Sequence, residues 1–69
     1  MSDIGIEVNG SSRNVAHGAT VRQLLQELQL DGRTVVVEVN RQIVRRTELA
    51  DTVLEPGDRV ELVHFVGGG

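Results

Sequence analysis

The sequence predicts an α+β domain in which one main helix packs on one face of a mixed β-sheet. Apolar residues alternate with polar ones over several short runs, which is typical of half-buried strands. Over one further run the apolar residues recur with helical spacing, which predicts a single amphipathic helix. The length, 69 residues, is enough for one small domain. A helix layer on a sheet layer buries the apolar faces of both.

The first residues of the chain predict a β-hairpin. Residues 4–8 (IGIEV) alternate apolar with small or polar side chains, as in a strand with one buried face. Asn9-Gly10 follows, and this pair favours a type I′ turn, in which both central residues need positive φ. The returning strand, residues 12–15, is mostly polar, so we expect it at an edge of the sheet.

The main helix is expected directly after this hairpin. Thr20 is a suitable N-cap, and Gln23 three residues later completes a capping box. The apolar residues of one helix face then recur at i, i+3, i+4 and i+7: Val21, Leu24, Leu25 and Leu28. We expect a helix of about three turns that ends at Asp31-Gly32, because glycine accepts the left-handed conformation after a helix.

The next part of the chain predicts two more strands and a short helical turn. Residues 35–39 are mostly β-branched, and the odd-numbered valines of this run share one face. Asn40-Arg41 is expected to turn the chain into a short strand at residues 43–44. Leu49 is expected to be buried in a helical turn.

The last strand, residues 59–65, follows a turn that proline and glycine specify. Pro56 and Gly57 suit the central positions of a type II turn. Alternation then divides the strand between two faces, with Val60 and Leu62 on one and with Glu61, Val63 and Phe65 on the other.

The outer face of the sheet is a candidate docking surface for a partner. If Val60 and Leu62 face the helix, then Val63 and Phe65 face solvent, and Val36 lies on the same side of its own strand. A cluster of exposed apolar residues marks a binding surface, although Phe65 could instead fold back over the edge of the core. His64 is either a simple strand residue or a partner contact. A basic patch of Arg41, Arg45 and Arg46 is either a solvated edge or a further contact.

Composition excludes several classes of function. The chain has no cysteine and no grouping of side chains typical of a catalytic site, a metal site or a bound cofactor. A net charge of −3 argues against nucleic acid as a partner. No apolar run is long enough to span a membrane, and no signal peptide is evident, so we expect a cytoplasmic protein. His17 lies in a glycine-flanked loop, and we expect it to be solvated.

The final residues, Phe65-Val66-Gly67-Gly68-Gly69, are the most unusual feature of the sequence. We expect a domain over residues 1–66 and a flexible tail over residues 67–69. Glycine has no Cβ, so such a tail can thread a narrow channel in a partner and present the carboxylate of Gly69 there. The alternative is a frayed terminus or a remnant of cloning.

The whole chain resembles the ThiS family, the sulfur carriers of thiamine biosynthesis, which are ubiquitin-like β-grasp proteins. The resemblance covers the first strand with its Asn9-Gly10 turn, the helix start at residues 20–25, the strands at 35–40 and 43–44, the turn at residues 56–58 and the tail. The short length and the ending VHFVGGG favour this family over the small subunit of molybdopterin synthase, which tends to have prolines before its glycines.

This resemblance implies a function for the tail. An E1-like adenylyltransferase of the ThiF type would use ATP to adenylate the carboxylate of Gly69. Sulfur derived from a cysteine desulfurase would then convert it to a thiocarboxylate, which a thiazole synthase of the ThiG type would consume. Gly67, Gly68 and Gly69 would enter the active sites of these enzymes, and the chain would be a protein cosubstrate and no enzyme. The alternatives are a carrier for another pathway and a ubiquitin-like modifier or interaction module.

Overall fold

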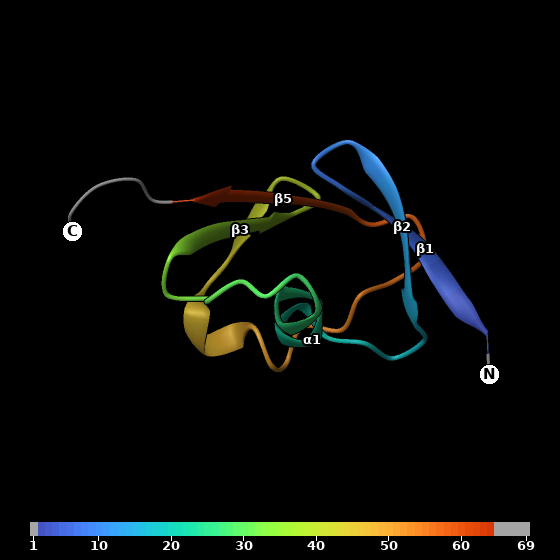
Figure 1. Cartoon of the computed structure of the whole chain (residues 1–69), viewed down its shortest axis with the longest axis horizontal. Coiled ribbons are helices and arrows are strands. Elements are labelled where there is room, and N and C mark those ends of the chain that lie inside the picture. Colours follow the sequence, from blue (N-terminus) through green and yellow to red (C-terminus); the bar gives the residue numbers. More distant parts are fainter. Residues whose placement is uncertain (1, 65–69) are drawn as a thin grey trace.

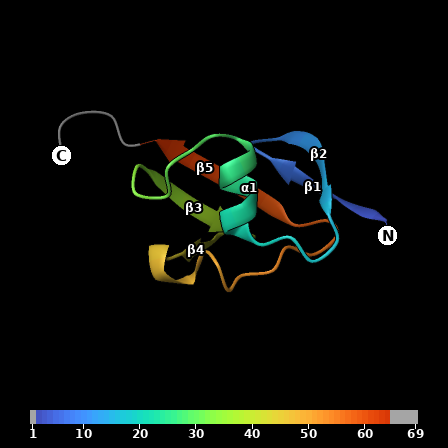
Figure 2. The same cartoon turned by 60° about the horizontal axis from the view of Figure 1, so that its bottom comes forward.

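The computed structural model describes residues 2–64, and these form a five-stranded mixed sheet with one α-helix on one face. The strand order is β2-β1-β5-β3-β4, with β1 and β5 parallel and all other neighbours antiparallel. Figure 1 shows the helix below the sheet, and the rotated view of Figure 2 places it across β5 and β3. The elements are β1 (Asp3–Val8), β2 (Ser11–Ala16), α1 (Val21–Glu27), β3 (Val35–Val39), β4 (Gln42–Val44), η1 (Arg46–Glu48) and β5 (Arg59–His64). The predicted α+β architecture is confirmed.

The hairpin of β1 and β2 has the predicted turn and the predicted edge. Asn9 and Gly10 both have positive φ, at 49° and 83°, as a type I′ turn requires. Strand β2 pairs only with β1 and forms one edge of the sheet. Its polar side chains are tolerated because one side of this edge strand has no neighbouring strand and faces solvent.

Helix α1 begins as predicted but ends earlier than predicted. Thr20 accepts from the Gln23 amide at 3.2 Å, and the Gln23 side chain accepts from the Thr20 amide at 2.9 Å, which completes the capping box. The helix then spans only seven residues, about two turns. Its end is a Schellman motif, in which Leu30 N–H donates to Leu25 C=O at 2.9 Å and Gln29, at φ 59°, takes the left-handed position.

The prediction that Asp31-Gly32 ends the helix was therefore wrong, and Gly32 has a different role. Gly32 is not among the residues with positive φ. A Cβ at this position would lie 2.8 Å from Leu49 Cδ1 and 3.6 Å from Leu25 Cδ1. Glycine is favoured here because a Cβ would come too close to the buried Leu49 side chain, not because it caps the helix.

The core lies between the sheet and the helix. The buried apolar residues come from every layer: Ile4, Ile6, Val15, Ala19, Val21, Leu24, Leu25, Val35, Val37, Leu49, Leu54, Val60 and Leu62. They include the predicted inner faces of the first, third and last strands and the predicted burial of Leu49, which directly follows the short helix η1. The predicted turns are present too: Asn40 and Arg41 have φ of 52° and 70°, and Gly57 has φ of 85°.

No helix in the described part of the chain is long and apolar enough to cross a membrane.

Candidate functional site

Strand β5, which leads into the tail, is the central strand of the sheet. It pairs with β3 from Val60 to His64. It pairs with β1 only near its first residue, where Glu7 faces Arg59 and Val8 faces Val60. The second half of β5 therefore has a strand partner on one side only, and residue 65 follows this half in the chain.

A side chain continues the pairing of β5 where β1 turns away. The Asn9 amide group binds both backbone groups of Leu62: Leu62 N–H donates to Asn9 Oδ1 at 2.8 Å, and Asn9 Nδ2 donates to the Leu62 carbonyl at 3.3 Å. The Asn9 backbone N–H also donates to the Val60 carbonyl at 2.9 Å. Asparagine thus serves as turn residue and as a substitute strand partner, because its amide carries one donor and one acceptor group like a peptide unit.

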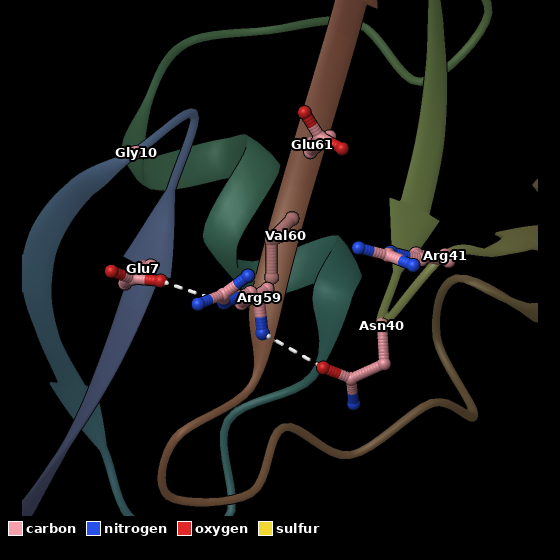
Figure 3. Close-up of a pocket in the computed structure, with 7 residues that line it drawn as sticks. All are labelled: Glu7, Gly10, Asn40, Arg41, Arg59, Val60 and Glu61. Carbon is pink, nitrogen blue, oxygen red and sulfur yellow. Dashed lines mark hydrogen bonds and ion pairs between the residues drawn. The ribbon is translucent and has the colours of Figure 1, made fainter.

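A second asparagine anchors the beginning of β5 from the other side. Asn40 N–H donates to the Arg59 carbonyl at 2.8 Å, and Arg59 N–H donates to Asn40 Oδ1 at 3.0 Å. Asn40 Nδ2 reaches Asp58 Oδ1 at 2.9 Å, and the Arg59 side chain pairs with Glu7 at 3.1 Å. Glu7, Asn40 and Arg59 line an open hollow of about 560 Å³. Figure 3 shows these three residues on the strands, with the helix behind them.

The outer face near the end of β5 carries the predicted apolar pair. Val36 on β3 lies directly opposite Val63 on β5, and Val63 is 60% exposed whereas Val36 is half-buried. Sequence analysis missed a third member, Ile43, which lies opposite Glu38 on the same face and is 66% exposed. The adjacent pair Ile43-Val44 was the available signal, because neighbouring residues of a strand face opposite sides and Val44 is the one that packs against the core. We call Val36, Ile43 and Val63 the apolar patch.

His64 does not share this face. It lies opposite Val35, on the side of the sheet that Val60 and Leu62 present to the helix, and its side chain is exposed beyond the core. The predicted docking candidates are thus divided between two faces of the same strand end. Phe65 and Gly67, Gly68 and Gly69 lie outside the described residues.

The residues of the predicted basic patch flank the short strand β4. Arg41 lies in the turn before β4, whereas Arg45 and Arg46 follow β4, so the strand separates them. Because β4 and β5 are both antiparallel to β3, Arg45 and Arg46 lie at the end of the sheet where β5 ends. Arg33 lies there too, just before β3. The Arg33 side chain donates to the Asp31 carboxylate, with its shortest hydrogen bond at 2.9 Å, and the Arg33 backbone N–H donates to it at 2.8 Å. These hydrogen bonds lower the pKa of Asp31, and the side-chain bonds raise the pKa of Arg33.

The described residues contain no group of three or more side chains suited to hold a metal ion. What the fold provides at this site is a well-anchored central strand that ends beside an apolar patch. Such a strand can hold a following segment at a fixed place relative to a docking face, and this is a positioning role.

Comparison with known proteins gives a family. The ThiS family model matches residues 6–69. The thiazole synthases of Paramagnetospirillum magneticum and Magnetococcus marinus are 44% and 39% identical over 90% and 93% of this chain. The chain spans only about a fifth of the length of these two relatives, 19% and 20%.

Two further relatives match over most of their own length. The sulfur carrier protein ThiS of Bacillus subtilis is 40% identical over 50 residues, which cover 72% of this chain and 76% of that protein. The crystal structure of the thiamine biosynthesis protein ThiS from Geobacter metallireducens superposes with a TM-score of 0.82 at 33% identity, covering 96% of this chain and all of that one. The sequence match over residues 6–69 and the shared fold lead to one conclusion: this chain belongs to the ThiS family.

Proposed function

We propose that this chain is a sulfur carrier of thiamine biosynthesis and that Gly69 carries the sulfur as a C-terminal thiocarboxylate. The observation that carries the proposal is the family match, which extends through residue 69 and so includes all three tail glycines. The relative in Bacillus subtilis is a sulfur carrier protein, and this chain covers most of it.

The chemistry requires activation because a carboxylate is a poor electrophile. The Gly69 carboxylate oxygen attacks the α-phosphorus of ATP, pyrophosphate leaves, and an acyl-adenylate forms. The outer sulfur of a persulfide then attacks the acyl carbon and expels AMP, which forms an acyl disulfide. A second thiol attacks the donor sulfur of that acyl disulfide, so the thiocarboxylate leaves and a disulfide between the two thiols remains. The chain itself supplies the carboxylate and a narrow stalk, since three glycines place no side chain in the channel through which they pass.

The partners follow from these steps. An E1-like adenylyltransferase of the ThiF type provides ATP binding, and a cysteine desulfurase provides the sulfur. A thiazole synthase of the ThiG type accepts it, and the likeness of this chain to about a fifth of two thiazole synthases supports that partner. Because the proposed adenylation requires ATP, we expect the carrier to act in the cytoplasm. The chain is a cosubstrate of these enzymes and needs no cofactor of its own.

Deleting Gly69 tests the proposal. The fold should be unchanged, with the same melting temperature, because the variant alters no residue of the described domain. The new carboxylate would lie about 3.3–3.6 Å short of its place in the adenylation site. A misplacement of about 1 Å can reduce a rate by a factor on the order of a hundred. We therefore expect almost no thiocarboxylate, measured by intact mass after incubation with the adenylyltransferase, ATP and a sulfur source.

Two controls accompany this test. The wild-type chain must gain the mass difference of sulfur for oxygen, and the deletion variant must still bind the adenylyltransferase. Wild-type yield of thiocarboxylate from the deletion variant would contradict the assignment of Gly69 as the sulfur-bearing residue.

We also propose that the apolar patch, together with Phe65 and His64, contacts the partner enzymes. Truncating an aromatic anchor at the centre of an interface costs about 2 kcal/mol or more of binding free energy. Phe65→Ala should therefore weaken binding to the adenylyltransferase or thiazole synthase more than it lowers the free energy of unfolding. Val53→Ala is the matched control, because Val53 is an exposed apolar residue, 49% accessible, outside the patch. A Phe65→Ala variant that unfolds readily yet binds normally would place Phe65 in the core.

A further inference from the structure

The outer face of β3 and β5 is built of cross-strand pairs with different chemistry. Nearest the beginning of β5, Arg59 is paired with Glu7 of β1. Two residues further on, Glu61 lies directly opposite Glu38 of β3. Two residues beyond that, Val63 lies opposite Val36. The same face therefore presents an ion pair, then two glutamates opposite each other on neighbouring strands, then two valines.

The pair of carboxylates has no neutralising partner among the described residues. Neither Glu38 nor Glu61 makes an ion pair within 4.0 Å, whereas Glu7, Glu27 and Asp31 each have an arginine. Arg59 is engaged by Glu7, and Arg41 lines the same hollow as Glu61 without reaching it. Figure 3 shows the Glu61 carboxylate directed away from the Glu7–Arg59 pair.

Like charges directly opposite each other on neighbouring strands destabilise a sheet. The facing of Glu38 and Glu61 therefore destabilises the free domain. The two glutamates lie next to the apolar patch, and Glu61 lies in the strand that precedes the tail. A cation placed between the two carboxylates would convert repulsion into two attractive contacts. An arginine fits best, because its planar guanidinium can bind two acceptors at once.

We propose that Glu38 and Glu61 together form a receptor for an arginine or lysine of thiazole synthase, with the apolar patch binding a neighbouring apolar side chain. This inference rests on the proposed function. The choice of thiazole synthase rests on the two relatives in which a segment like this chain belongs to a thiazole synthase. The five residues after His64 span at most about 18 Å, so an enzyme that uses Gly69 lies within reach of the strand end that carries this face.

The first arm of the test measures stability of the free carrier. Glu61→Gln and Glu38→Gln remove the repulsion, so each should raise the melting temperature by a few degrees, on the order of 2–4 °C. Glu55→Gln removes the same charge from an exposed turn where no like-charged residue is paired with it across the sheet, and it should leave the melting temperature unchanged. A fall or no change for both receptor variants would show that the carboxylates do not repel and would overturn the inference.

The second arm measures binding to the thiazole synthase of the same organism. The Glu38→Gln, Glu61→Gln double variant should raise Kd by about tenfold, with a weaker dependence on salt, while Glu55→Gln should bind like the wild-type chain. Normal binding by the double variant would overturn the proposal that Glu38 and Glu61 bind a cationic side chain. Weaker binding to the adenylyltransferase instead would overturn the choice of partner.

The proposed function can fail separately. Thiocarboxylate formation by the wild-type chain is measured first, and its absence would count against the sulfur-carrier proposal whatever the glutamates do. The melting temperatures of the free variants do not depend on that outcome. Thiocarboxylate formation by the double variant is measured as well, and a loss of it would assign the glutamates to the adenylyltransferase and overturn the choice of partner.

Discussion

Gln29 is one of two described residues, with Arg41, that have positive φ although they are neither glycine nor asparagine. It has φ of 59° in the position after helix α1 that is usually occupied by glycine. Asn9 and Asn40 also have positive φ, but asparagine tolerates this conformation better than glutamine does. The Schellman hydrogen bonds and the packing of Leu30 against the core maintain the conformation of Gln29 despite its strain.

Gln29→Gly should therefore stabilise the protein. Removing the Cβ relieves the left-handed strain, and part of this gain is offset by the greater freedom of glycine in the unfolded chain, so we expect a net gain of about 0.5–1 kcal/mol. Urea or thermal unfolding measures it. Gln26→Gly is the control, because Gln26 is an exposed residue inside the helix, where glycine should cost about 1 kcal/mol. Equal destabilisation by both substitutions would show that position 29 is not strained.

The end of the helix also shows what the sequence could not predict at this scale. The glycine at position 32 has a structural reason, but two different reasons can select glycine at a position. A cap needs positive φ, whereas Gly32 needs space beside Leu25 and Leu49. Leu49 is distant in the sequence, so local pattern alone could not distinguish the two. Glutamine is not a residue type that predicts the left-handed conformation, so the sequence did not reveal that Gln29 ends the helix.

Strand β5 is the element on which the proposed function depends, and two asparagines fix it. Asn40 binds the backbone of Arg59 at the beginning of the strand. Asn9 binds the backbone of Leu62 near its end and so satisfies polar groups that β1 no longer reaches. Without these contacts the half of β5 that leads to the tail would be held by β3 alone.

Asn9→Gly should loosen that half of β5 without altering the turn. Glycine keeps the positive φ but loses both side-chain hydrogen bonds to Leu62, each worth about 0.5–1.5 kcal/mol, so we expect about 1–2 kcal/mol lower stability. Hydrogen exchange should also accelerate at the Leu62 amide, whose acceptor is Asn9 Oδ1. Asn14→Ala, on the edge strand β2, has no such contact and should change stability by less than about 0.5 kcal/mol. Unaltered Leu62 exchange would refute the anchoring role.

The sequence pattern predicted the strands and the helix correctly, but it did not predict which residues of different strands lie next to each other in the sheet. Alternation placed the strands because burial of one face imposes a period of two on each strand separately. The grouping of Val36, Ile43 and Val63, and the facing of Glu38 with Glu61, depend on register between strands far apart in the sequence. The register between strands is set by the packing of the whole core. The sequence could therefore predict that the site lies at the end of the last strand, but not which residues of other strands lie beside it.

At the scale of the whole molecule, the parallel pairing of β1 and β5 places the beginning of β1 far from the end of β5. Val8 lies opposite Val60, so Asp3 lies five residues to one side of this pair and His64 four residues to the other. At about 3.3 Å per residue the beginning of β1 and the end of β5 are roughly 30 Å apart. Figure 1 shows them at opposite ends of the sheet.

This separation predicts that a tag has opposite consequences at the two ends. A hexahistidine tag before Met1 would lie far from the tail, so thiocarboxylate formation should stay at the wild-type rate. The same tag after Gly69 converts the carboxylate to an amide and moves the free carboxylate away, so thiocarboxylate should be undetectable by intact mass. Both proteins should melt like the untagged chain, because neither tag alters the core. Removing the second tag with a protease that restores Gly69 as the last residue should recover activity. Full thiocarboxylate formation with the C-terminal tag still attached would show that the sulfur is carried elsewhere.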